Sequence, residues 1–265
     1  MLASSSAAGI ELCHHGQAGF VIRGQGTALG IDLFLSDRAD RLFAGVAPES
    51  LAPLDAILTT HEHGDHFDRP SWPRLAASSP GARFIVPAPL VDAAAEVVDR
   101  DRVDGAFVDR EIRIGAARIV PVPARHGRHL ADAYTFGTEL SGGLHRYLGY
   151  VIELGGVRVY HGGDTIRYGG MAERLRTLAI DVALLPINGR TPEREALGLV
   201  GNLGYAEAAD LAADAGIPVL IPMHFDLIGR NSEDPRKLVA DAAARHPGLT
   251  IRIPERRVWM HVAVR

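Results

Sequence analysis

Cysteine is nearly absent from this sequence, and several other features are missing altogether. Cys13 is the single cysteine among 265 residues, which excludes an intramolecular disulfide framework and a zinc knuckle built on cysteines. The net charge is −4 and no run of basic residues occurs, so nothing indicates a nucleic-acid partner. No apolar run approaches the length of a membrane span, and the first residues lack the basic and apolar regions of a secretion signal. We expect a soluble cytoplasmic protein with no nucleic-acid or membrane partner.

The length predicts one domain over residues 1–265, large enough to bury roughly three-quarters of the surface that the unfolded chain exposes. No linker, repeat or low-complexity tract divides it. Apolar runs typical of strands alternate with runs typical of helices, so we expect an α+β fold with two mixed sheets facing each other and helices outside. Strands are expected at 10–13, 19–23, 28–33, 54–59, 83–86, 118–122, 147–154, 157–161, 181–185, 219–222, 250–253 and 258–262, and helices at 89–98, at 205–215 and from Asp234-Pro235 onward.

The most informative segment is His61-Glu62-His63-Gly64-Asp65-His66, with the spacing H-x-H-x-D-H. Imidazole nitrogens and a carboxylate suit zinc, manganese or iron. The segment follows the apolar run 54–59, which predicts a buried strand. It therefore lies just past the carboxyl end of a strand, where sites in α/β folds are usually built.

Further candidate ligands stand at the ends of three other predicted strands. His126 follows the run 119–122, Asp164 follows 157–160 and His224 follows 219–222. One donor at each strand end would bring all of them into one cleft. His129 is the alternative to His126, although it lies farther from its strand.

The order of these motifs resembles the ligand order of the metallo-β-lactamase superfamily. Within it, the sequence is most similar to the L-ascorbate-6-phosphate lactonase-like branch, and the similarity spans nearly the whole chain. The segments that carry this second resemblance are Gly16-Gln17-Ala18-Gly19-Phe20, Gly163-Asp164-Thr165, Leu185-Pro186-Ile187-Asn188-Gly189-Arg190, the stretch 201–208 and Ile221-Pro222-Met223-His224-Phe225-Asp226.

The resemblance implies a four-layer αββα sandwich with two divalent metal ions in a cleft at its edge. His63 separates the chain from the similar flavo-di-iron proteins, which place an acid at that position. The residue types leave the choice between zinc and manganese open. The implied ligands are His61, His63 and His126 for one ion, Asp65, His66 and His224 for the other, and Asp164 between the two.

Five residues near the expected site receive roles beyond direct ligation. An arginine fork such as that of Arg190 can hold a phosphate or carboxylate, so Arg190 and Asn188 are candidate substrate contacts; the alternative for Arg190 is a salt-bridged loop residue. Asn202 is a further substrate candidate or part of the turn into a helix. Asp32 is expected to orient a ligating histidine. His161 is either a proton relay behind the ligands or a structural residue.

Two cations close together lower the pKa of a water molecule and provide hydroxide at neutral pH. Asp65 and Asp164 are therefore the candidate catalytic residues, as ligands that also place the nucleophile. The first hypothesis is a lactone or ester hydrolase acting on a small polar substrate, phosphorylated or not. A metal-dependent phosphodiesterase is the alternative, and a non-catalytic metal-binding protein is a third hypothesis. The lactonase relatives form homo-oligomers, and the resemblance extends that expectation to this chain.

Overall fold

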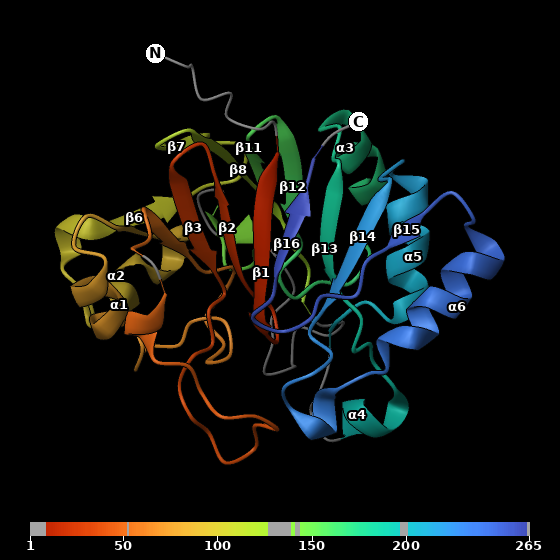
Figure 1. The fold of residues 1–265 in the computed structure, drawn as a ribbon, viewed down its shortest axis with the longest axis horizontal. Coiled ribbons are helices and arrows are strands. Elements are labelled where there is room, and N and C mark those ends of the chain that lie inside the picture. The colour runs from red at the N-terminus through yellow and green to blue at the C-terminus, as the bar shows by residue number, and fades with distance from the viewer. Residues whose placement is uncertain (1–8, 52, 127–138, 141–143, 197–200, 264–265) are drawn as a thin grey trace.

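Two β-sheets of seven strands each face one another in the computed structural model (Figure 1). The structure describes residues 9–51, 53–126, 139–140, 144–196 and 201–263. The strands of the first sheet are β1 (Ile10–Gly16), β2 (Gly19–Gly24), β3 (Thr27–Ile31), β4 (Ala56–Leu58), β5 (Arg83–Pro87), β6 (Val103–Ala106) and β16 (Trp259–Val262). Those of the second are β7 (Ile112–Ile114), β8 (Ala117–Pro123), β11 (Leu148–Leu154), β12 (Val157–His161), β13 (Val182–Pro186), β14 (Val219–Met223) and β15 (Thr250–Ile251). A separate two-stranded ribbon joins β9 (Glu139–Leu140) to β10 (Leu144–His145).

Both sheets are mixed, as the sequence predicts. The first has the order β16-β1-β2-β3-β4-β5-β6, antiparallel as far as β3 and parallel beyond it. The second has the order β15-β14-β13-β12-β11-β8-β7, antiparallel from β7 to β12 and parallel from there to β15. The β11–β12 hairpin turns at Gly155 and Gly156, whose φ angles of 58° and 80° suit the two central positions of a tight hairpin turn.

Side chains that alternate along the strands build three apolar cores. In β2, Phe20 and Ile22 point into the core between the two sheets, whereas Val21 points to the outer face. In β13, Leu184 and Leu185 divide between the inner core and the outer core of the second sheet in the same way. These strands are buried on both faces, and this is why they appear in the sequence as continuous apolar runs.

Helices cover both outer faces and complete four layers (Figure 1). On the first sheet lie α1 (Trp72–Ser78) and α2 (Val91–Ala95), which contribute Trp72, Leu75 and Ala94 to the outer core. On the second sheet lie α3 (Met171–Thr177), α5 (Tyr205–Asp214) and α6 (Pro235–Arg245), and α4 (Pro192–Ala196) precedes α5 in the chain. The αββα sandwich implied by the resemblance is confirmed.

The helix boundaries agree only partly with the sequence. Asp234 caps α6 by accepting the backbone N–H of Arg236, and Gly216 follows α5 at φ 71°, as the residue types predict. The helix predicted at 89–98 is wrong in extent. Its α-helical part ends at Ala95, and beyond it the N–H of Val97 makes the tighter bond to the carbonyl three residues back, that of Ala94.

The strand pairing brings several carboxyl ends to one edge of the sandwich. The end of β12 pairs with the start of β11, which in turn pairs with the end of β8. Because β13 and β14 run parallel to β12, their carboxyl ends lie at the same edge. The loop from β3 to β4 and the helix α4 lie at the lower edge in Figure 1. In the described part of the chain, every helix is too short or too polar to cross a lipid bilayer.

Candidate metal centre

Four loops that follow strands bring the predicted ligands together. His61, His63, Asp65 and His66 come after β4, His126 after β8, Asp164 after β12 and His224 after β14. They form two groups of possible ligand atoms, each group lying within 4.8 Å. The first group is His61, His63, His126 and Asp164, and the second is Asp65, His66 and His224. His129 lies outside the described residues.

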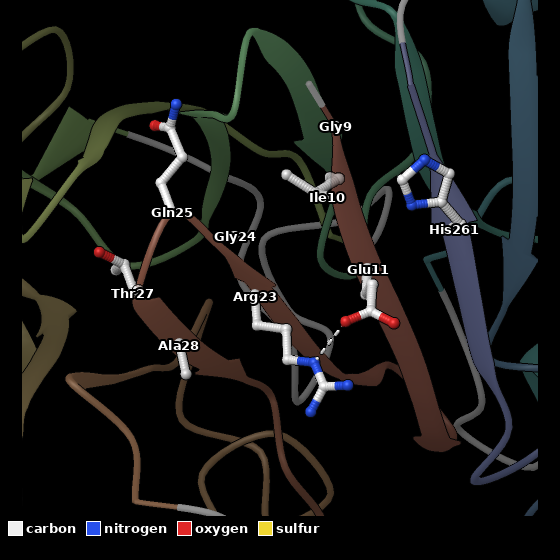
Figure 2. Close-up of a pocket in the computed structure, with 10 residues that line it drawn as sticks. Gly9, Ile10, Glu11, Arg23, Gly24, Gln25, Thr27, Ala28 and His261 are labelled. Atoms are coloured by element: carbon white, nitrogen blue, oxygen red, sulfur yellow. Dashed lines mark hydrogen bonds and ion pairs between the residues drawn. The ribbon is translucent and has the colours of Figure 1, made fainter. Parts of the chain in front are cut away.

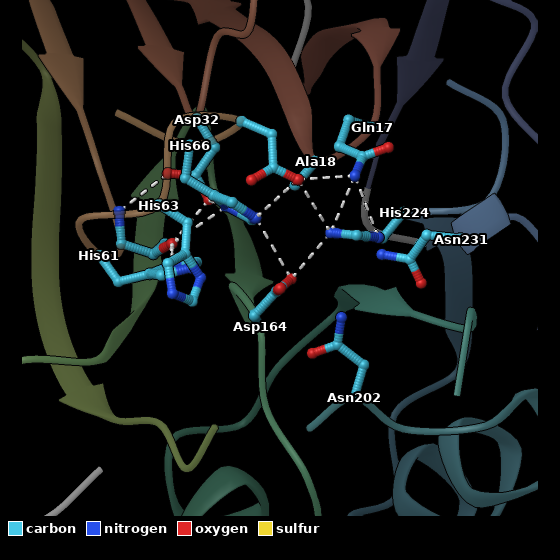
Figure 3. Close-up of polar contacts among 12 residues, drawn as sticks. Gln17, Ala18, Asp32, His61, His63, His66, Asp164, Asn202, His224 and Asn231 are labelled. Atoms are coloured by element: carbon cyan, nitrogen blue, oxygen red, sulfur yellow. Dashed lines mark hydrogen bonds and ion pairs between the residues drawn. The ribbon is translucent and has the colours of Figure 1, made fainter. Parts of the chain in front are cut away.

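Asp164 belongs to the first group and also faces the second, where Figure 3 shows its contacts with His66 and His224. Its Oδ2 is 3.6 Å from Nε2 of His126 in the first group. Its Oδ1 is 3.3 Å from Nε2 of His66 and 3.4 Å from Nε2 of His224 in the second. The carboxylate therefore offers one oxygen to each group, which is the placement that a ligand shared by two ions requires.

The three imidazoles of the first group stay neutral. Burial lowers the pKa of His61 and His126, and it lowers the pKa of His63 to about 3. Nε2 of His61 is 2.8 Å from Nδ1 of His63. A neutral imidazole keeps a lone pair for a metal ion, so these rings have the protonation state that ligation needs.

The second group carries protons in the metal-free chain. Burial acts to lower the pKa of His66 and His224, but the Asp164 carboxylate and its acidic neighbours outweigh burial, holding His66 well above its usual value and His224 at about 9. Burial likewise acts to raise the pKa of Asp164, while His224 and His66 hold it well below its usual range. A divalent cation would replace these imidazole protons as the partner of the carboxylates.

The arrangement fits a metal ion better than it fits a closed hydrogen-bond network. Nε2 of His66 and Oδ1 of Asp164 are both buried, and neither makes a hydrogen bond of acceptable geometry within the described part of the chain. Buried polar atoms are normally satisfied, and such exceptions are a common mark of an ion site. The donor set of imidazoles and carboxylates suits a first-row divalent ion.

Asp32 orients a histidine of each group, directly or through Thr60. Its Oδ2 lies 2.7 Å from Nδ1 of His66, which leaves Nε2 of that ring facing the second group. The Thr60 hydroxyl donates to the same Oδ2 at 2.7 Å and lies 3.0 Å from Nδ1 of His61. Asp32 is fully buried and adopts φ 48°, a left-handed conformation that Asp tolerates better than most non-glycine residues. These contacts are the ones that the role expected of Asp32 requires.

His161 contacts backbone rather than ligands. Its Nε2 lies 2.8 Å from the carbonyl of Ala18, and its Nδ1 accepts the N–H of Gly163 at 3.2 Å. Because both ring nitrogens are engaged in this way, the geometry favours the structural alternative over a proton relay.

The predicted substrate contacts separate into two kinds. Arg190 forms a two-pronged ion pair with Glu207 and donates to the carbonyl of Asn202 at 2.8 Å, which favours the salt-bridged alternative. Asn202 instead donates to Asn188 at 3.0 Å, and Asn188 donates to Asn231 at 2.8 Å. Asn188 and Arg190 also line a cavity of about 500 Å³, whose lining, among the described residues, includes none of the candidate ligands.

Two residues at the centre received no role from the sequence. Tyr147 is buried, and its ring centre lies 5.5 Å from that of His61 and 5.6 Å from that of His126. Gln17, in the β1–β2 turn, contacts both Asp65 and His224. In the sequence, the only indication of a role for Gln17 is that it lies in a segment that carries the family resemblance. No motif in the sequence indicates a role for Tyr147.

Comparisons with known proteins agree with this geometry. A family model described as a β-lactamase superfamily domain matches residues 30–225. A UPF0173 metal-dependent hydrolase of Thermococcus kodakarensis is 32% identical over 242 residues, covering 86% of this chain and 91% of the relative. Igni18, a metallo hydrolase of Ignicoccus hospitalis, has a TM-score of 0.73 and 20% identity over 97% of this chain and 99% of its own. An isothiocyanate hydrolase from Delia radicum gut bacteria has a TM-score of 0.70 and 18% identity over 96% of this chain and 100% of its own.

The two kinds of match carry different weight. At these identities the solved structures establish the fold alone. The family model spans more than half of the chain, and the archaeal relative covers most of both sequences. The chain therefore belongs to the metallo-β-lactamase superfamily and is a metal-dependent hydrolase.

Proposed function

We propose that this hydrolase uses two divalent ions, zinc or manganese, to cleave an ester or lactone bond in a small polar substrate. The observation that carries the proposal is the position of Asp164, with one oxygen toward each group of ligands. A tetrahedral site uses four ligands, and seven donors exceed that number. In the proposed assignment, His61, His63 and His126 hold one ion, Asp65, His66 and His224 hold the other, and Asp164 bridges them.

The ions would supply Lewis acidity and a water molecule of lowered pKa. The side chains would hold the ions, orient the ligands and exclude water. Asp65 presents Oδ2 at 3.5 Å from Nε2 of His224, where it would hold the second ion and could orient the attacking water. Asp32 and Thr60 keep the rings of His66 and His61 turned toward the centre. Tyr147 packs against the rings of His61 and His126 and keeps bulk water from that side.

The state of Arg190 favours an ester or lactone over a phosphodiester. Its guanidinium is already neutralised by Glu207, so it is less suited to hold a phosphate. Asn188 and Asn202 stay the proposed substrate contacts, because their amides are uncharged and Oδ1 of Asn202 has no hydrogen-bond partner within the described residues. The similarity of segments 185–190 and 201–208 to the lactonase-like branch supports the same substrate class.

Activity on a substrate panel tests the proposal. Metal-reconstituted protein is assayed on lactones, sugar-phosphate esters and bis-p-nitrophenyl phosphate, with isothiocyanates added because one structural neighbour hydrolyses them. We expect turnover of lactones or esters that a chelator abolishes and added metal restores. Turnover of the phosphodiester alone, or turnover that resists the chelator, would contradict the proposal.

A further inference from the structure

Gln17 lies in the turn between β1 and β2 and is completely buried. Its backbone is fixed on both sides: the N–H donates to Oδ1 of Asp226 at 3.0 Å, and the carbonyl accepts the N–H of His224 at 2.6 Å. Its φ is 55°, so a conformational cost is met to keep this residue in place. The turn is thereby held against the loop that carries His224.

The side chain of Gln17 ends at the second group of ligands (Figure 3). Its Nε2 is 2.7 Å from Oδ2 of Asp65 and 3.0 Å from Nε2 of His224. Its Oε1 points away; it is buried and has no hydrogen-bond partner within the described part of the chain.

The spacing of these atoms is that of ligands around one ion. Two donor atoms that lie about 2.1 Å from a metal ion are about 3 Å apart when they meet it at right angles. In the second group, the donor atoms of His66 and His224 lie 3.3 Å and 3.4 Å from Asp164. Nε2 of Gln17 approaches Asp65 and His224 at similar distances. The end of this side chain therefore occupies one more position around the site of the second ion.

The present orientation of the amide is the one expected without a cation. An amide nitrogen has no lone pair for a metal ion, whereas an amide oxygen is a common ligand of hard cations. The two ends are nearly equal in size, and the hydrogen bonds around them decide which way the group faces. Here Oε1 lacks a partner within the described residues, so the hydrogen bond from Nε2 to the Asp65 carboxylate sets the orientation. A cation beside Asp65 would reverse that preference.

We propose that Gln17 is an additional ligand of the ion held by Asp65, His66 and His224. Its amide turns by about half a revolution when the ion binds, so that Oε1 replaces Nε2 at the centre. This inference rests on the proposed two-ion function. The alternative is that Gln17 keeps its nitrogen toward Asp65 and only donates a hydrogen bond to it.

Two substitutions at this position distinguish a ligand from a donor. Gln17→Met keeps the length and the unbranched shape but removes the oxygen, and Gln17→Glu keeps an oxygen but removes the N–H donor. If Gln17 is a ligand, Gln17→Met lowers the affinity for the second ion by more than about tenfold, and Gln17→Glu binds that ion at least as tightly as the wild type. If Gln17 is a donor, both variants lower the affinity for the second ion. Gln17→Met loses the N–H donor, and the carboxylate of Gln17→Glu repels that of Asp65. That result would overturn the inference.

Gln25→Met is the matched control. Gln25 also has a left-handed backbone, φ 48°, but it is exposed and lies past the other end of β2, beside a shallow hollow (Figure 2). The circular dichroism and melting temperature of each metal-free protein establish that the variants fold. Metal affinity is then measured by chelator competition, and the visible absorption of the cobalt-loaded proteins reports the coordination number.

We expect the cobalt absorption of Gln17→Met to be stronger than that of the wild type, because loss of a ligand moves cobalt toward four-coordination; Gln25→Met should match the wild type. If the wild type binds two ions and Gln17→Met equals it in affinity and spectrum, the inference about Gln17 fails while the two-ion proposal stands. If the wild type binds only one ion, the two-ion proposal fails, and this inference fails with it.

Discussion

Asp32→Asn should weaken binding of the second ion more than binding of the first, because Asp32 contacts His66 directly and His61 only through Thr60. Three donors converge on the two oxygens of Asp32: the N–H of Thr60 at 2.8 Å, its hydroxyl at 2.7 Å and Nδ1 of His66 at 2.7 Å. Asparagine tolerates the left-handed backbone but offers a single oxygen. Its NH₂ group must then face either the N–H of Thr60 or the side shared by the Thr60 hydroxyl and His66. If it faces His66, the ring takes the opposite tautomer and presents a proton to the metal ion.

The expected size follows from these contacts. Loss of the partner that orients a ligating histidine costs about 10- to 100-fold in metal affinity, or about 1.4–2.8 kcal/mol. Loss of a charge-assisted hydrogen bond also lowers the free energy of unfolding by about 1.5–3 kcal/mol. Chelator competition measures the first effect, and denaturant unfolding of the metal-free protein measures the second.

Asp68→Asn provides a control for the stability effect. Asp68 is also buried and accepts the N–H groups of Leu35 and Ser36, both at 2.8 Å, and the hydroxyl of Ser71, but none of these partners is a candidate ligand, whereas one partner of Asp32 is. It should lose stability and keep metal affinity. If Asp32→Asn bound both ions as tightly as the wild type, the reasoning about ring orientation would be refuted.

Three more predictions concern charge. Asp164→Asn keeps the shape of the bridging side chain but removes its charge. Elemental analysis should therefore find about one ion or fewer per chain, and turnover should fall by several orders of magnitude. Wild-type metal content with more than about a tenth of wild-type turnover would mean that the bridge lies elsewhere. At pH 7.5 the pKa of His224, about 9, and the raised pKa of His66 keep both rings protonated without metal. Loading should therefore release at least two protons per chain, two from these rings and a further one where a bound water becomes hydroxide, and fewer as the pH rises through 9. Calorimetry in buffers of different ionisation enthalpy measures this, and no release at pH 7.5 would contradict it. Arg190→Ala should keep both ions and the wild-type KM, while its melting temperature falls by a few degrees because the lost contact is with Glu207. A raised KM for anionic substrates with unchanged metal content would contradict this and would support the role of Arg190 as a substrate contact.

The ligand groups could be predicted because they depend on local sequence. Each donor follows an apolar run, and the carboxyl ends of such strands meet at one edge once the sheets form. His61, His126, Asp164 and His224 therefore needed no knowledge of the exact register. The fold class followed in the same way from strands buried on both faces.

The remaining contacts depend on long-range packing. Gln17 meets His224 across 207 positions, and Arg190 chooses Glu207 over a substrate only because α5 places that acid beside it. β6 contains an Asp-Gly pair, which disfavours a strand, and it forms because β5 offers a parallel edge. Residue types alone do not decide between such alternatives.

Metal content per chain tests the central claim most directly. The wild-type protein is stripped with a chelator, reconstituted with zinc or manganese, freed of unbound metal and analysed for metal and protein in the same sample. The geometry around Asp164 predicts two ions per chain, with hydrolytic activity returning as the ions are restored. A stoichiometry of one ion or none in folded protein, or full activity without metal, would contradict the account.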